Sequence, residues 1–410
     1  MNSNLNLTNF TSLEKKNIYF IIFLPISLFT GSLIANINIL AIIFIFFLDC
    51  HKDKNFFFLK EKNFYLLVVF NVYLVFNSLI TGINEDSLIR AFGFLRYIIL
   101  AYAIYYYLNV NNKKYENIIF KFWTFIFIVV TFDCIFEYIF GYNTLNFKSG
   151  YNGRLASFTG DELKIGAYYF AFVLISAIFL KNYNNKIFYI SLIIFLVVSL
   201  LIGERSNFIK VIFISLFFLL FIKNISIKKK FIYIFLIIFV FPLLILSNDV
   251  FKNRFFNSVV NLFTVQFSPV KNKHICHYTS AIKIFKNYPL FGVGVKKYRV
   301  ESNKQIYKVQ VDDKNSFVCN QTHPHQLHFE LLAELGIIGY ILFISYFIFF
   351  IFKSFKKFKN KNDEFSFGST LFILAIILPL LPSGSFFTTY TATLFWINYS
   401  IALRNLKDLN

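Results

Sequence analysis

The chain has 410 residues, is 57% hydrophobic and is only 15% charged, whereas soluble globular proteins carry about 25% charged residues. Its formal net charge is +20, but most of the lysines lie in short loops between apolar runs. This positive-inside arrangement orients membrane helices and argues against nucleic-acid binding. Composition therefore excludes a soluble protein and indicates a multi-pass membrane protein.

Apolar runs long enough to cross the hydrocarbon core recur from one end of the chain to the other. With the basic loops placed in the cytoplasm, we predict an all-α integral membrane protein with about 12 transmembrane helices and both ends cytoplasmic. The expected spans are residues 17–32, 33–49, 63–81, 89–109, 118–140, 163–180, 187–203, 206–222, 231–247, 327–352, 367–382 and 388–404.

Two segments between the expected spans are longer than simple turns. Residues 141–162 form one of them, and residues 248–326 form a large loop on the outer, periplasmic face. The predicted organisation is therefore nine helices in residues 1–247, the large loop, and three helices in residues 327–410. Loops of such length are usually functional. The polar N-terminus shows no cleavable signal peptide.

The end of the large loop concentrates half of the chain's six histidines in the stretch "THPHQLH". Thr322 as a helix cap and Pro324 in the first turn predict that a helix begins here. On such a helix His325, Gly336 and Gly339 share one face, and the glycines would let another helix approach closely. A neutral imidazole at this edge suits general-base work.

Two other interpretations of these histidines stay open. A histidine at a helix N-terminus is often only a satisfied interfacial residue. Alternatively, His323, His325 and His328 could bind zinc, although no carboxylate or thiolate partner has a recognisable spacing.

Three motifs resemble the bacterial O-antigen ligase family. His325-Gln326, nine residues, Gly336, two residues and Gly339 reproduce its signature. "NYPLFGVGVKKYR" (287–299) resembles the stretch that precedes that signature, and "GERSNFIK" (203–210) resembles the family's turn between two helices. The expected topology agrees, with a large outer loop just before the motif helix. The resemblance implies a membrane glycosyltransferase of the glycosyltransferase C-like fold.

The resemblance also implies the substrates and the place of reaction. Such enzymes transfer a glycan from undecaprenyl diphosphate to lipid A–core at the periplasmic face of the bacterial inner membrane, without metal or other cofactor. Besides these lipids and the surrounding membrane, no nucleic-acid partner is expected.

Residue roles follow from the matched motifs. His325 is expected to be the general base, and outer-face cations are expected to bind the diphosphate. Of these, Arg205 is assigned to catalysis and Arg154 and Arg299 to substrate binding, with Arg90 as a weaker choice. His277 stands where family members often have an arginine and is expected to substitute for it. His323 and Gln326 complete the expected substrate-binding set, and no metal ligand is assigned.

Related activities remain as alternatives. An O-antigen polymerase, or a protein O-oligosaccharyltransferase, would use the same carrier. Polymerases commonly show Arg-x10-Gly motifs, and none of Arg154, Arg205, Arg254 and Arg299 begins one. A glycan-lipid flippase would place unusual charges in both halves at mid-membrane, whereas here they gather on one face.

Two pairings are also expected. Arg96 and Asp133 lie at similar depth below the outer ends of their spans and are predicted to form an ion pair near Glu137, because unpaired charges in a membrane are costly. Cys276 and Cys319 are the two cysteines of the large loop, and a disulfide between them is possible in an oxidising compartment.

Overall fold

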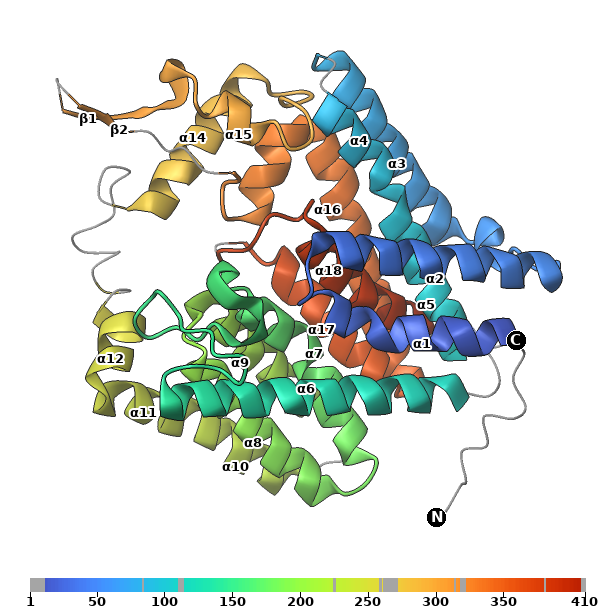
Figure 1. Cartoon of the computed structure of the whole chain (residues 1–410), viewed down its shortest axis with the longest axis vertical. Coiled ribbons are helices and arrows are strands. Elements are labelled where there is room, and N and C mark those ends of the chain that lie inside the picture. Colours follow the sequence, from blue (N-terminus) through green and yellow to red (C-terminus); the bar gives the residue numbers. More distant parts are fainter. Residues whose placement is uncertain are drawn as a thin grey trace.

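The computed structural model describes residues 12–82, 85–109, 114–223, 226–257, 260, 272–312, 315–317, 322–379 and 381–406. Helices dominate these residues, and one two-stranded antiparallel sheet accompanies them. In Figure 1, α1, α2 and α6 lie side by side, while α14 and α15 lie beside the first part of α16.

The apolar runs that were predicted as spans form most of the helices. These are α1 (Ser12–Ser27), α2 (Ser32–Lys52), α3 (Lys62–Ile80), α4 (Glu85–Gly93), α5 (Leu95–Asn109), α6 (Lys114–Phe140), α7 (Ile165–Lys181), α8 (Asn185–Leu201), α9 (Arg205–Phe221), α10 (Ile227–Phe235), α11 (Phe241–Ser247), α16 (Leu327–Lys361), α17 (Glu364–Ile377) and α18 (Thr389–Ala402). The large loop contributes α12 (Asp249–Phe251), α14 (Lys273–Asn287), α15 (Tyr298–Glu301), β1 (Val309–Asp312) and β2 (Asn315–Phe317).

Short 3₁₀ and π-helical turns connect or extend these elements. The 3₁₀ turns are η2 (Phe57–Lys60), η3 (Ser157–Glu162), η6 (Gln305–Tyr307) and η7 (Leu403–Asn405). The π-helical turns are η4 (Leu236–Val240) and η5 (Lys252–Asn257).

Burial separates central helices from peripheral ones. Helix α7 buries 14 of its 17 residues, as expected of a helix that is apolar on all sides. Helix α10 buries none of its residues, although it begins a stretch that is apolar enough to cross a membrane. Large apolar side chains such as Leu33 (72% exposed) and Phe352 (68% exposed) cover the outside of the bundle. A surface of this kind is suited to lipid rather than water.

Each of the twelve predicted spans overlaps a described helix, with α4 and α5 together, and α10 to α11 together, forming one each. Six stretches among the described residues are long and apolar enough to cross a membrane: Ser32–Lys52, Lys62–Ile80, Glu85–Asn109, Tyr115–Phe140, Ile227–Ser247 and Leu327–Lys361. The multi-pass, all-helical membrane character is thus supported, while the count of twelve stays a prediction.

One of the two glycines of the motif helix does not admit another helix as predicted. Helix α16 is interrupted at Gly336, whose φ is 64°, and a Cβ there would lie 2.3 Å from the carbonyl oxygen of Leu290. The Pro289 carbonyl accepts a hydrogen bond from the Ile337 N–H at 2.8 Å. Gly336 therefore admits the turn of residues 289–294, not another helix, while Gly339 makes room for the Tyr73 ring of helix α3.

Candidate functional site

The histidine stretch turns sharply before α16 begins. His325 has a φ of 59°, a left-handed conformation that is uncommon outside glycine. The cap is Gln326, whose Oε1 accepts from the Phe329 N–H at 3.0 Å, and the helix starts at Leu327. The prediction that the helix begins at Thr322 and Pro324 is therefore wrong. Because His325 precedes the helix, its side chain does not belong to the predicted helical face.

Three other imidazoles surround the ring of His325. Its centroid lies 4.1 Å from that of His323, 5.5 Å from that of His274 and 5.7 Å from that of His277. The last two residues belong to α14, which packs against α16. We call these four residues the histidine cluster. The structure thus brings His277 and His323, both assigned to substrate binding from the sequence, close to His325 together with His274.

The histidine cluster favours neutral imidazoles. Burial, followed by the charges of its three neighbours, lowers the pKa of His325 to about 3. Burial and nearby cations lower the pKa of His323 to about 4. Burial and then Arg205 lower the pKa of His274. At neutral pH His325 is therefore uncharged and able to accept a proton.

His328, the third histidine of the sequence motif, lies outside the cluster's chemistry. Its Nδ1 is 2.9 Å from the Tyr340 hydroxyl and its Nε2 is 2.7 Å from the Ile377 carbonyl oxygen. Both ring nitrogens are occupied, so His328 fastens α16 to the end of α17 and is not free to join a zinc site. No group of three His, Cys, Asp or Glu residues within the described part of the chain has the arrangement to hold a metal ion.

Arginine side chains gather around the turn between α8 and α9. Arg154 Nη2 lies 3.2 Å from Glu204 Oε1. Arg205 Nη1 donates to the Arg254 carbonyl at 3.4 Å, and Arg254 Nε donates to the Gly203 carbonyl at 2.5 Å. We call Arg154, Arg205 and Arg254 the arginine cluster.

The arginine cluster carries more positive charge than the neighbouring carboxylate of Glu204 can neutralise. Burial, followed by the charges of Arg154 and Arg205, lowers the pKa of Arg254 to about 10. Three guanidinium groups beside the one carboxylate of Glu204 leave excess positive charge, and guanidinium forks suit phosphate oxygens. Arg254 was not assigned from the sequence, because nothing in the large loop marks its arginine as different from a solvated one.

Close backbone packing assembles the arginine cluster. Gly203 has a φ of 75°, and a Cβ there would lie 1.9 Å from the Gly153 carbonyl oxygen. The Leu155 N–H donates to the Ile202 carbonyl at 3.2 Å. The loop that carries Arg154 therefore lies directly on the turn that carries Arg205.

Two acidic residues of α6 secure that same loop. Asp133 accepts from the Thr144 N–H at 2.9 Å and from the Ser157 hydroxyl at 2.7 Å. Glu137 accepts from the Ala156 and Ser157 N–H groups at 2.8 and 2.6 Å. Hydrogen bonds from the loop's N–H groups and from the Ser157 hydroxyl satisfy these two carboxylates, and the same bonds hold the loop in place.

The predicted ion pair between Arg96 and Asp133 is therefore wrong. Arg96 donates instead to the Gly93 carbonyl at 2.8 Å and to the Tyr97 hydroxyl at 2.7 Å. Equal depth in the membrane does not determine the direction in which two side chains point. Asp133 accepts hydrogen bonds from Thr144 and Ser157 in place of an ion pair with Arg96.

The two clusters lie within electrostatic reach of each other, since the charge of Arg205 acts on His274. The charges of Lys296 and Arg299 likewise act on His323. Gln326 is buried and caps α16, so the structure gives it a structural contact.

Only one of the two cysteines of the expected disulfide lies within the described residues. Cys276 is fully buried and disulfide-bonded, while Cys50 and Cys134 are free. Cys319, the predicted partner, lies outside the described residues.

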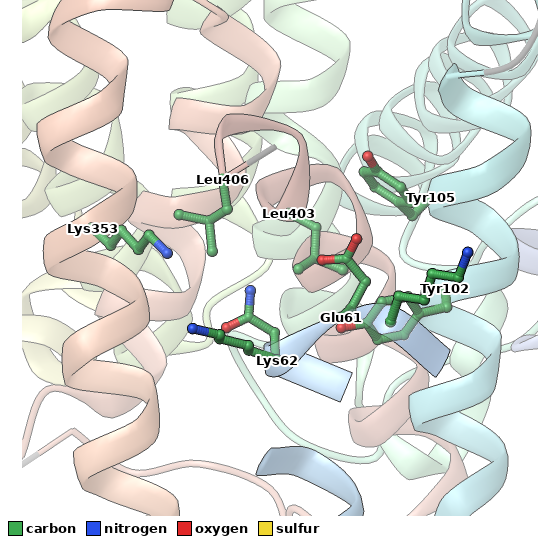
Figure 2. Close-up of a pocket in the computed structure, with 9 residues that line it drawn as sticks. Glu61, Lys62, Tyr102, Tyr105, Lys353, Leu403 and Leu406 are labelled. Atoms are coloured by element: carbon green, nitrogen blue, oxygen red, sulfur yellow. The ribbon is translucent and has the colours of Figure 1, made fainter. Parts of the chain in front are cut away.

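A separate cleft of about 200 Å³ lies between the start of α3, α5, α16 and η7 (Figure 2). It is lined by Lys60, Glu61, Lys62, Asn63, Tyr102, Tyr105, Lys353, Leu403 and Leu406. None of the predicted site residues is among these, so this cleft is distinct from the two clusters.

Comparison with known proteins agrees with the motifs. Residues 189–344 match the model of a family described as O-antigen ligase. The matched range contains Arg205, Arg254 and the whole histidine cluster, while Arg154 precedes it. No curated protein matches the chain. The resemblance found from the sequence is confirmed over this range.

Proposed function

We propose that this chain, which belongs to the O-antigen ligase family through residues 189–344, transfers O-antigen glycan from undecaprenyl diphosphate to lipid A–core. The family supports a ligase- or polymerase-type enzyme that acts on lipid-linked glycans in the membrane. The choice of donor and acceptor, the periplasmic face of the inner membrane and the residue roles below belong to the proposal.

The observation that carries the proposal is the grouping of imidazoles around a neutral His325, in which the positive charge of Arg205 from the arginine cluster acts on His274. A glycosyl transfer from a diphosphate carrier needs a base for the incoming hydroxyl and cations for the departing diphosphate. His325 supplies the first, and Arg154, Arg205 and Arg254 supply the second.

The reaction is a single displacement. His325 takes the proton of the acceptor hydroxyl while its oxygen attacks the anomeric carbon of the donor sugar. The bond from that carbon to the diphosphate oxygen breaks, and its electron pair remains on the diphosphate, where the guanidinium groups stabilise it. The configuration at the anomeric carbon is inverted, no covalent enzyme intermediate forms, and no metal or other cofactor takes part.

The low pKa of His325 fits this sequence of events. An imidazole that is neutral before the donor binds is ready to accept a proton. The negative charge of the bound diphosphate, next to Arg205 and His274, then favours the imidazolium that forms, because opposite charges raise the pKa of a base.

His277, His323 and Arg299 complete the proposed substrate site. The first two adjoin His325, and the charge of Arg299 acts on His323. These positions allow contacts with the sugar hydroxyls or the far side of the diphosphate.

The experiment is the lipopolysaccharide banding of a strain that lacks the gene. Loss of a ligase leaves bare lipid A–core while carrier-linked polymer accumulates. Loss of a polymerase leaves core with one repeat unit, and unchanged lipopolysaccharide with loss of protein-linked glycan identifies a protein O-oligosaccharyltransferase. Restoration of the ladder by the wild-type gene, but not by His325→Ala, links the phenotype to the proposed base.

A further inference from the structure

The loop between α17 and α18 lies directly beneath the histidine cluster. The Ser383 N–H donates to the carbonyl oxygen of His325 at 2.8 Å. His325 has a φ of 59°, so this bond supports a residue in a sparsely populated backbone conformation.

Lys210 fixes the residue just before Ser383. Its Nζ donates to the Pro382 carbonyl at 3.1 Å and lies 5.9 Å from the centre of the Phe170 ring. The lysine is 3% exposed. Lys210 follows Arg205 by five residues on α9, so it lies about 7.5 Å further along the helix axis.

A buried ammonium group in a membrane helix carries a large desolvation cost. The charge of Glu204 acts on this ammonium group without forming an ion pair with it, and neither a backbone carbonyl nor a ring face offsets the desolvation cost as a contacting carboxylate would. Fold stability alone gives no reason for a lysine here, because a methionine would fill similar volume without the cost.

A second buried lysine fixes the same loop on the other side of Ser383. Lys296 Nζ donates to the Ser385 hydroxyl and lies 3.7 Å from Glu330 Oε1. The Ser385 hydroxyl in turn donates to Glu330, which also accepts from the Phe386 N–H at 2.9 Å. The loop is therefore held on both sides of the one N–H group that contacts His325.

We propose that Lys210 is a positioning residue for His325, acting through the Pro382 carbonyl and the Ser383 N–H. The role rests on the proposed function of His325, since Lys210 itself touches neither substrate nor the reacting atoms. Loss of the lysine frees residues 381–384, and the His325 carbonyl then loses its fixed donor.

The test uses the full-length protein in nanodiscs and has two readouts. The first is modification of His325 by diethyl pyrocarbonate, measured by mass spectrometry relative to the exposed His51, which does not depend on activity. The second is the transfer rate under saturating donor, with donor binding measured separately.

Lys210→Met should raise the modification of His325 severalfold and lower the maximal transfer rate by about 10²-fold, because small misplacements of a reacting group have effects of this size. Donor affinity should stay within about twofold. The matched control is Lys223→Met, since Lys223 also donates to a backbone carbonyl, that of Lys359, but is exposed and outside the site.

A second pair of variants tests the N–H group directly and does not depend on how the Lys210 variant folds. Ser383→Pro removes the donor to His325, whereas Ser383→Ala keeps it. The proline variant should behave like Lys210→Met, and the alanine variant should behave like the wild type.

Unchanged His325 modification and unchanged transfer in both Lys210→Met and Ser383→Pro would overturn the positioning role. Another outcome distinguishes a failure of the positioning role of Lys210 from a failure of the proposed function of His325. If His325 modification rises in these variants while His325→Ala still transfers glycan, the loop positions His325 as inferred, and the assignment of His325 as base is what fails.

Discussion

The histidine cluster and the arginine cluster act on each other electrostatically, yet they are built in opposite ways. Three imidazoles pack around His325, and burial lowers the pKa values of His274, His323 and His325, so these three are neutral. The guanidinium groups around Gly203 remain charged and are held by backbone carbonyls and Glu204. A neutral base beside an under-neutralised cationic site is an arrangement that suits a hydroxyl nucleophile and an anionic leaving group.

The largest expected effect is in the histidine cluster. His325→Ala should lower glycan transfer by about 10² to 10⁴-fold, the usual contribution of a general base. His328→Ala should cost much less, because His328 contacts Tyr340 and Ile377 and not the cluster. The measurement is the lipopolysaccharide ladder with equal membrane levels of both variants, and similar losses in the two would contradict the distinction.

Arg205→Ala should follow, with a loss of about 10² to 10³-fold, the effect of removing one donor to a developing oxyanion. Arg205→Lys should recover only part of the activity, since a point charge cannot make a bidentate phosphate contact. The control is Lys228→Ala, which removes an exposed cation of α10. Full activity of Arg205→Lys in a purified transfer assay would show that charge alone suffices.

Arg254→Ala should have a smaller effect, roughly tenfold, because one charge-assisted hydrogen bond is worth about 1.5 kcal/mol or more. Its neighbour Lys252 is exposed, so Lys252→Ala should leave transfer unchanged. The two variants are compared by donor affinity. If they weaken donor binding equally, Arg254 contributes only general positive charge.

Acid should destabilise the protein through the histidine cluster. The folded pKa values of His274, His323 and His325 lie below the usual value of about 6.5, so unfolding takes up protons as the pH falls below that value. The stability that these neutral histidines contribute is present above about pH 6.5 and is lost as the pH falls toward about 3 to 4.

The measurement is the thermal midpoint in detergent at a series of pH values. The midpoint should fall less in a His274→Gln, His323→Gln double variant than in the wild type. Equal slopes in the two proteins would show that other groups control the acid response.

The smallest expected effect is none. EDTA should leave transfer unchanged, since the proposed reaction uses side chains alone. If chelation abolishes transfer and zinc restores it, histidines act as metal ligands and His325 is not a free base.

The sequence predicted the site best where a motif determines the local backbone conformation. The spacing from His325 to Gly336 marked the histidine stretch and the position of α16, and "GERSNFIK" marked the turn that carries Arg205. The glycines, however, serve the close approach of residues 289–294 and of Tyr73, which spacing along one helix does not reveal.

The residues that were missed depend on contacts between distant segments. Arg254 enters the site because its side chain donates to Gly203, 51 residues away in sequence. The sequence does not distinguish Lys210 from a lysine in an apolar run whose side chain reaches the membrane surface. Its burial is apparent only from the position of the α17–α18 loop beside it. The Arg96–Asp133 pairing failed for the same reason, since depth alone was used and Asp133 found the loop of residues 144–157 instead.

Separate measurement of donor binding and glycan transfer tests the division between the two clusters most directly. With purified protein in nanodiscs and a lipid-diphosphate glycan donor, His325→Ala should bind the donor with unchanged affinity but fail to transfer it. Arg205→Ala should lose donor affinity. If instead His325→Ala transfers glycan at the wild-type rate, or loses donor binding as Arg205→Ala does, the histidine cluster does not supply the base.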